Sequence, residues 1–166
     1  MRTIEILGEN RFDTFSKVRE GCRGIVIQDG NILLSREEKT DWWLIPGGGI
    51  EEGESLKQCC EREVLEETGY IVEAGEQFLT LNEYYEEYKY VSHYFICKVV
   101  GQGQMKLTDY EKERGLVPKW IPFLGALEVY SKHEVYAPIS EPKRGSYQRE
   151  YVALREYMER RNENRT

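Results

Sequence analysis

Three glutamates near the middle of the chain have a spacing that could hold a metal ion. Glu63, Glu66 and Glu67 lie at i, i+3 and i+4 within the run from Ser55 to Thr68, which contains no Gly or Pro. This run is rich in Glu, Lys, Gln, Arg and Leu and predicts a helix, on which the three side chains share one stripe. Like charges at this spacing repel one another. Either water solvates the whole stripe, or a cation binds to it.

The residues around the stripe favour a cation. Three glycines, Gly47 to Gly49, follow Pro46 and predict a tight loop, because glycine takes positive φ freely and lets other groups approach the backbone. Carboxylate oxygens with loop carbonyls beside them suit Mg²⁺ or Mn²⁺ better than zinc. Arg62 keeps its charge and could orient the carboxylates through a bidentate pair.

The same residues belong to a longer pattern of fixed positions. Gly48 is followed after five residues by Glu54, and after seven more by REVLEETGY, which runs from Arg62 to Tyr70. Every specified position of G-x5-E-x7-R-E-U-x-E-E-x-G-U is filled, where U is apolar or aromatic. This stretch, residues 48–70, resembles the Nudix box of the MutT-type hydrolases.

The resemblance implies an activity and a set of site residues. Nudix proteins cleave nucleoside diphosphate derivatives at a pyrophosphate bond by attack of water on phosphorus, with Mg²⁺ or in some cases Mn²⁺ as the cofactor. The candidate catalytic residues are Arg62, Glu63, Glu66 and Glu67; the candidate metal ligands are Gly47, Glu54, Glu63, Glu66 and Glu67; the candidate substrate-binding residues are Arg36, Gly48 and Gly49. Arg36 is equally well interpreted as an exposed surface arginine, and Glu54 could stabilise the loop instead of reaching a second metal.

The general base stays open between two regions of the chain. In some family members it is the glutamate that matches Glu63, and in others it lies outside the box. Asp109, Glu111 and Glu113 precede Trp120 and could supply such an outside carboxylate, or they could be solvated loop charges. A non-catalytic nucleotide-sensing Nudix domain, or an interaction domain with a solvated acidic helix, are the alternative functions.

A tyrosine-rich region after the box bears on the substrate. Its aromatic residues are Tyr84, Tyr85, Tyr88, Tyr90, Tyr94 and Phe95. Nucleobases stack on aromatic rings, so these residues could bind a nucleotide. The alternative is that they are ordinary β-forming residues of a hairpin.

The composition limits the classes of partner. The net charge is −7, and the segment from Glu51 to Glu67 holds seven glutamates against Lys57 and Arg62, a net charge of −5. An acidic chain without a Lys/Arg block is a poor candidate for tight binding to nucleic acid or to a membrane surface. The N-terminus lacks the apolar core of a signal peptide, and no apolar run approaches transmembrane length, so we expect a cytoplasmic protein.

The four cysteines do not indicate a metal or disulfide framework. Cys22, Cys59, Cys60 and Cys97 contain no CxxC pair, and the chain has only two histidines. A zinc site or a set of structural disulfides is therefore not expected. We expect Cys60 and Cys97 to be small buried hydrophobic residues.

The order of the expected elements indicates the fold class. Strands are predicted at about 4–7, 24–27, 32–34, 42–45, 70–81, 89–100 and 117–122, and helices at 55–68, 123–130 and 148–162. This order predicts an α/β (α+β) fold with a mixed β-sheet, and the resemblance implies a Nudix-like α/β/α sandwich with a C-terminal helix. Residues 1–145 would form the Nudix hydrolase domain and 146–166 a C-terminal amphipathic helix of the same domain.

The C-terminal helix carries an apolar stripe of Tyr147, Tyr151, Leu154 and Met158. The stripe could pack on its own domain or on a second subunit, which would make a homodimer. The segment from Ala137 to Arg144 contains two prolines and is interpreted as a connector.

Overall fold

The computed structural model describes residues 1–165. Its strands are β1 (Arg2–Leu7), β2 (Lys17–Gln28), β3 (Asn31–Glu37), β4 (Trp42–Leu44), β5 (Gly47–Gly49), β6 (Tyr70–Tyr85), β7 (Tyr88–Gln102) and β8 (Leu116–Pro122). Its helices are α1 (Leu56–Thr68), α2 (Asp109–Arg114), α3 (Phe123–Ser131), the 3₁₀ helix η1 (His133–Tyr136) and α4 (Glu141–Glu163).

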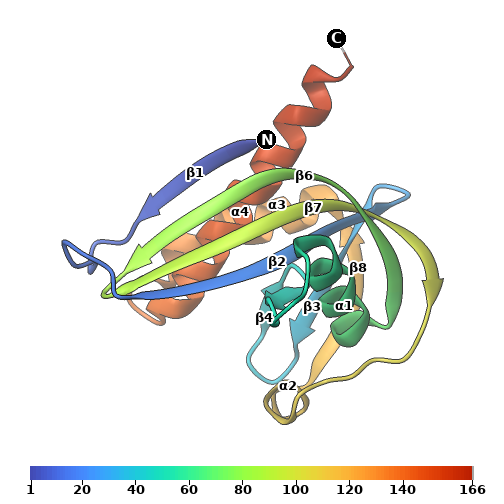
Figure 1. Ribbon diagram of the computed structural model, residues 1–166, viewed down its shortest axis with the longest axis horizontal. Helices are drawn as coiled ribbons and strands as arrows, with labels where there is room; N and C mark the ends of the chain where they lie inside the picture. The colour runs from blue at the N-terminus through green and yellow to red at the C-terminus, as the bar shows by residue number, and fades with distance from the viewer. Residues whose placement is uncertain (166) are drawn as a thin grey trace.

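The strands form one mixed sheet (Figure 1). Its main path is β1-β6-β7-β2-β3-β4, while β5 pairs with β2 and β8 pairs with β3. The β1·β6 and β2·β7 pairs are parallel, and β6·β7 and β2·β3 are antiparallel. The antiparallel pair β2·β3 is joined by a turn at Asp29-Gly30. The mixed sheet expected from the sequence is confirmed.

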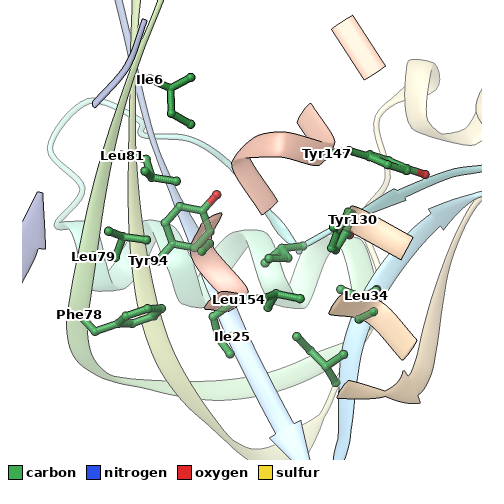
Figure 2. Close-up of a cluster of buried hydrophobic side chains, with 14 residues drawn as sticks. Ile6, Ile25, Leu34, Phe78, Leu79, Leu81, Tyr94, Tyr130, Tyr147 and Leu154 are labelled. Atoms are coloured by element: carbon green, nitrogen blue, oxygen red, sulfur yellow. The ribbon is translucent and has the colours of Figure 1, made fainter. Parts of the chain in front are cut away.

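Helices cover both faces of this sheet and divide the core in two. On one face the helical contribution comes from α3 and α4, including Tyr130 and Leu154 (Figure 2). On the other face it comes from α1, with Cys59, Cys60 and Val64. Successive strand residues point to opposite faces, so neighbouring residues of one strand enter different cores. The expected α/β/α sandwich with a C-terminal helix is confirmed.

The helix α1 is defined at both ends by local signals. The Ser55 side chain accepts from the Gln58 N–H at 3.1 Å, and the Gln58 side chain accepts from the Ser55 N–H at 2.9 Å, which makes a capping box. Gly69 ends the helix in the left-handed conformation, and its N–H donates to the Leu65 carbonyl. Both ends lie where the sequence predicted them.

All four cysteines are buried and reduced, and they lie in the core beneath α1. Cys22 comes from β2, Cys59 and Cys60 from α1, and Cys97 from β7. The Cys60 and Cys97 sulfur atoms are 3.6 Å apart. The expectation that Cys60 and Cys97 are buried is confirmed.

A buried ion network ties α4 to the sheet. Glu150 is fully buried, although it lies on the helix face that packs in the apolar core. Its Oε1 accepts from Arg149 Nε at 2.7 Å and from the Tyr94 hydroxyl at 3.2 Å, and its Oε2 accepts from the Ile45 N–H at 3.2 Å. Arg23 lies 3.8 Å from the same carboxylate. These contacts fix the middle of α4 against β7, β2 and the residue that follows β4.

Three sequence predictions are wrong in the details. Gly47–Gly49 is a short strand paired with β2, not a loop. The segment from Ala137 to Arg144 is not a connector, because α4 begins at Glu141 with Pro142 in its first turn, where proline is tolerated. Residues 109–114, interpreted as loop, form the helix α2. In the first case a pairing partner distant in sequence decided the structure.

Candidate active site

The predicted carboxylate stripe of α1 faces the three glycines of β5. Glu67 Oε2 accepts a hydrogen bond from the Gly47 N–H at 3.2 Å and from the Ser35 hydroxyl at 3.4 Å. The Glu63 carboxyl group lies against Gly48 so closely that a Cβ on that glycine would be 2.6 Å from it. Close approach, and not positive φ, is what this glycine is needed for.

Arg62 connects most of the other acidic groups. Its Nε and Nη2 atoms donate to the two oxygens of Glu54 at 2.6 and 3.1 Å. Its Nη1 donates to Glu63 at 2.7 Å and to Glu66 at 3.3 Å, and its Nη2 also reaches the Gly49 carbonyl at 3.0 Å. One guanidinium therefore holds the loop, the helix and β5 together. This bidentate arrangement is the one expected for Arg62.

Burial and mutual repulsion act on the carboxyl groups that face β5. Burial raises the pKa of Glu67 to about 8, with Arg23 acting against the shift and the charges of Glu63 and Glu111 adding to it. Burial also raises the pKa of Glu63, which Arg62 lowers in part. Their charged forms are therefore destabilised here, and a bound cation would relieve that destabilisation.

Glu111 differs from the other two candidate bases outside the box, because its charge acts on the carboxyl groups of α1. It is half-buried, and its charge raises the pKa of both Glu63 and Glu67. Its Oε2 is buried and has no hydrogen-bond partner among residues 1–165. Asp109 and Glu113, by contrast, are exposed. A buried carboxylate oxygen without a partner is costly, and a cation or a bound water would satisfy it.

The donor set fits a hard divalent cation. Within residues 1–165, no three His, Cys, Asp or Glu side chains are gathered closely enough to hold a metal ion. Arg62 draws Glu54, Glu63 and Glu66 to itself, which accounts for this. The unpartnered Glu111 oxygen and the raised carboxyl pKa values nevertheless suit a cation bound by oxygen ligands, such as Mg²⁺.

The predicted substrate residue Arg36 lies apart from these groups. Its Nη2 donates to Asp41 at 2.8 Å, and its guanidinium lies over the Trp43 ring at 5.1 Å. These contacts belong to the β3–β4 hairpin. A substrate contact by Arg36 stays a prediction.

A cavity of about 590 Å³ lies beside Gly48 and Gly49. Three arginines that the sequence analysis did not select, Arg19, Arg23 and Arg149, line it. Its size is within the range of about 300–1,000 Å³ that is usual for ligand pockets. Cationic side chains beside a glycine strand are suited to a phosphate group.

A sequence signal for Arg149 existed and was missed. Glu150 lies three residues after Tyr147 and four before Leu154, so helical spacing places a carboxylate on the apolar face of the C-terminal helix. Such a group needs a cation next to it. The neighbouring Arg149 is that cation.

Alanine is expected to have a different effect at each glycine of β5. In Gly47→Ala the new Cβ would lie 2.2 Å from the Cys22 carbonyl oxygen, a backbone atom, and overpacking of this kind costs roughly 1–3 kcal/mol of stability. In Gly48→Ala the clash is with the Glu63 carboxyl group, the end of a flexible side chain. We therefore expect little loss of stability there, but weaker Mg²⁺ binding.

Urea unfolding of both variants and calorimetric titration with Mg²⁺ would measure these effects. Gly49→Ala is the matched control for stability, because the nearest atom to its Cβ is the Glu20 carbonyl oxygen at 4.0 Å. Equal stability of the Gly47→Ala and Gly49→Ala variants would contradict the described pairing of β5 with β2.

Comparison with known proteins identifies the family. The family model described as the NUDIX domain matches residues 19–141. The RNA pyrophosphohydrolase of Baumannia cicadellinicola subsp. Homalodisca coagulata is 39% identical over 137 residues, which cover 68% of this chain and 84% of that protein. A match to the RNA pyrophosphohydrolase of Wolbachia pipientis subsp. Culex pipiens is 43% identical but covers only 29% of this chain and 32% of that protein.

A solved structure supports the same fold. The NUDIX hydrolase from Nitrosomonas europaea aligns with a TM-score of 0.57 and 21% identity, and covers 83% of this chain and 91% of that chain. Among the helices of residues 1–165, none is both long and apolar enough to cross a membrane. The family match over most of the chain, together with the filled box and the α/β/α sandwich, shows that this chain belongs to the Nudix hydrolase family.

Proposed function

We propose that this chain hydrolyses a nucleoside diphosphate derivative at a pyrophosphate bond, with Mg²⁺ as its cofactor. The observation that carries the proposal is that Glu63 and Glu67 of α1 lie against the glycines of β5, with the charge of Glu111 acting on both. The cavity lined by Arg23 and Arg149 lies beside these glycines. Acidic groups for a metal therefore adjoin basic groups for a phosphate.

Each group has a separate task in this proposal. Glu63, Glu66 and Glu67, with the Gly47 carbonyl, would hold Mg²⁺, which offsets phosphate charge and lowers the pKa of water when it is bound. Arg62 keeps the carboxylates in place through its contacts to Glu54 and Gly49, so Glu54 stabilises the loop.

The remaining tasks are proton transfer and phosphate binding. Glu111 is a better candidate for the outside base than Asp109 or Glu113, because its Oε2 is buried without a partner among residues 1–165 and its charge acts on Glu63 and Glu67, while the other two are exposed. Glu63 stays the candidate base within the box. Arg23 and Arg149 would bind phosphate oxygens in the cavity.

Product release in the presence of Mg²⁺ or EDTA tests the proposal. The substrates are nucleoside triphosphates, dinucleoside polyphosphates, ADP-ribose, nucleotide sugars and an RNA oligonucleotide with a 5′-triphosphate, and phosphate, pyrophosphate and nucleotide products are measured. We expect turnover with Mg²⁺, its loss with EDTA and its recovery with Mg²⁺ or Mn²⁺. Turnover that is unchanged by EDTA would contradict the proposed metal dependence.

The alternative is a non-catalytic nucleotide-sensing domain. The hold of Arg62 on Glu63 and Glu66 favours it, because a cation must compete with this guanidinium. Nucleotide binding without turnover of any substrate would support this alternative over hydrolysis. The cytoplasmic location and the homodimer stay predictions.

A further inference from the structure

A second cavity, of about 340 Å³, is lined by residues at the end of the β6–β7 hairpin and in the first turns of α4. Three tyrosines of the aromatic region, Tyr85, Tyr88 and Tyr90, line it. The rings of Tyr88 and Tyr90 are stacked, with centroids 5.4 Å apart. Tyr94 is instead fully buried in the core, and the Tyr84 ring contacts Phe15.

This tyrosine cavity adjoins the cavity beside the glycines of β5. Tyr90 and Arg149 line both. A ligand could therefore place an aromatic group among the tyrosines and extend past Arg149 toward Gly48. A nucleotide has this form, with a planar base at one end and phosphates at the other.

Glu83 gives the tyrosine cavity a specific polar group. It lines the cavity, yet the residue is only 3% exposed. Its carboxylate lies 3.8 Å from Arg149 Nη1, which is beyond hydrogen-bond distance. The neighbouring Tyr85 hydroxyl is buried and has no partner of ordinary hydrogen-bond geometry among residues 1–165. Burial raises the pKa of the Glu83 carboxyl, a hydrogen bond of poorer geometry from Tyr85 lowers it, and the two carboxylate oxygens can accept further hydrogen bonds from a ligand.

We propose that the tyrosine cavity binds the base of a guanine nucleotide, with Glu83 accepting hydrogen bonds from the base edge. This inference deepens the proposed function and rests on it for the fate of the phosphates.

The chemistry of the base edge supports guanine. An ionised carboxylate only accepts hydrogen bonds, and it can accept two parallel ones. Guanine offers two adjacent donors, the ring N1–H and the 2-amino group, whereas adenine offers its 6-amino group beside a ring nitrogen that accepts. Burial raises the pKa of Glu83 and Arg149 lowers it, so donors from a base would add to the stabilisation of the charged form.

Equilibrium binding of nucleoside monophosphates tests the base pocket separately from hydrolysis, because they contain no pyrophosphate bond. Calorimetry with GMP, IMP and AMP in the presence of EDTA is expected to give binding at least about tenfold tighter for GMP than for AMP, since a site built for donors rejects a base that lacks them. IMP, which lacks the 2-amino group, should bind between the two. Equal affinity for GMP and AMP would overturn the proposal.

Two variants and a control assign the effect to named residues. Glu83→Gln should weaken GMP binding about tenfold or more and AMP binding much less, because hydrogen bonds to a charged acceptor are lost. Glu87→Gln removes the same charge next to the hairpin turn, where Glu87 pairs with Lys17, and should leave both affinities unchanged. Tyr90→Leu should weaken GMP and AMP alike, by at least about fivefold, through loss of stacking.

The outcomes separate the two proposals. Preferred binding of GMP without turnover of any guanine nucleotide would support the base pocket and count against the hydrolase. Turnover of nucleotides without preferred binding of GMP would support the hydrolase and overturn the base pocket. If Glu83→Gln does not fold, the comparison of GMP, IMP and AMP on the unmodified chain still decides, because it needs no variant.

Discussion

Replacing Glu67 by glutamine is expected to lower kcat by at least about 100-fold, on the scale of losing one strong electrostatic contribution to catalysis. Glu67 is the carboxylate that β5 and Ser35 hold by hydrogen bonds, and glutamine keeps its size while removing the charge. Steady-state hydrolysis with saturating Mg²⁺ measures the effect. If the Glu67→Gln variant retained its activity, this result would contradict the assignment of Glu67 as a metal ligand.

The same substitution should not destabilise the metal-free protein. Burial raises the pKa of Glu67 from 4.5 to about 8, so between these values the folded chain holds a proton that the unfolded chain has lost. Stability of the unmodified chain therefore falls as the pH rises through this window. Glutamine does not titrate, so with EDTA the variant should match or exceed the unmodified chain in Tm at pH 8, and lose this advantage near pH 5.

A matched control lies on the same helix. Glu61 Oε1 accepts from the Ala74 N–H at 2.9 Å, and glutamine at this position keeps an acceptor oxygen. Glu61→Gln should leave kcat unchanged and show no comparable gain of Tm at pH 8. A similar loss of activity in both variants would indicate a general effect of charge on α1.

Replacing Glu150 by leucine is expected to lower the free energy of unfolding by about 3–5 kcal/mol, because removal of one partner leaves a largely buried charge uncompensated. Arg149 would lose its 2.7 Å partner and keep the Glu83 carboxylate at 3.8 Å and the Ser146 hydroxyl at 3.5 Å. The Tyr94 hydroxyl and the Ile45 N–H would lose their acceptor as well. Urea unfolding followed by circular dichroism gives the difference.

Two further variants test whether the loss of stability in Glu150→Leu comes from the buried network. Glu150→Gln keeps one acceptor oxygen and should lose less stability than Glu150→Leu. Glu159→Leu, at a position of α4 that is 49% exposed, should change the free energy of unfolding by less than about 1 kcal/mol. A loss for Glu150→Leu no larger than that for Glu159→Leu would show that the buried network contributes little.

Local signals explain why the ends of the box helix could be predicted to within one residue. Ser55 caps its start and Gly69 its end, and both act within a few residues of the chain. The strand at Gly47–Gly49 could not be predicted in this way, because its partner in β2 is more than 20 residues earlier in the sequence. Three glycines in a row indicate close backbone approach, but not what approaches.

In the candidate site, too, some features follow from local sequence and others depend on the tertiary structure. The carboxylates of α1 and their contact with Arg62 follow from helical spacing. The choice of Glu111 over Asp109 and Glu113 depends on how the short helix α2 is turned, which no periodicity in so short a segment decides. Glu83 lies on the same face of β6 as Leu79 and Leu81, because the three residues are two positions apart, and all three are buried. A charged residue that continues an apolar strand face is a signal that sequence reasoning could have used.

The position of the four cysteines allows thiol labelling to report when α1 separates from the sheet. Each sulfur lies in the layer between α1 and the sheet, so a thiol reagent can reach it only when the two separate. Because α1 also carries the candidate metal ligands, the rate of thiol labelling measures how often that helix leaves its place. A ligand that binds across α1 and β5 would slow the labelling in proportion to how firmly it holds them together.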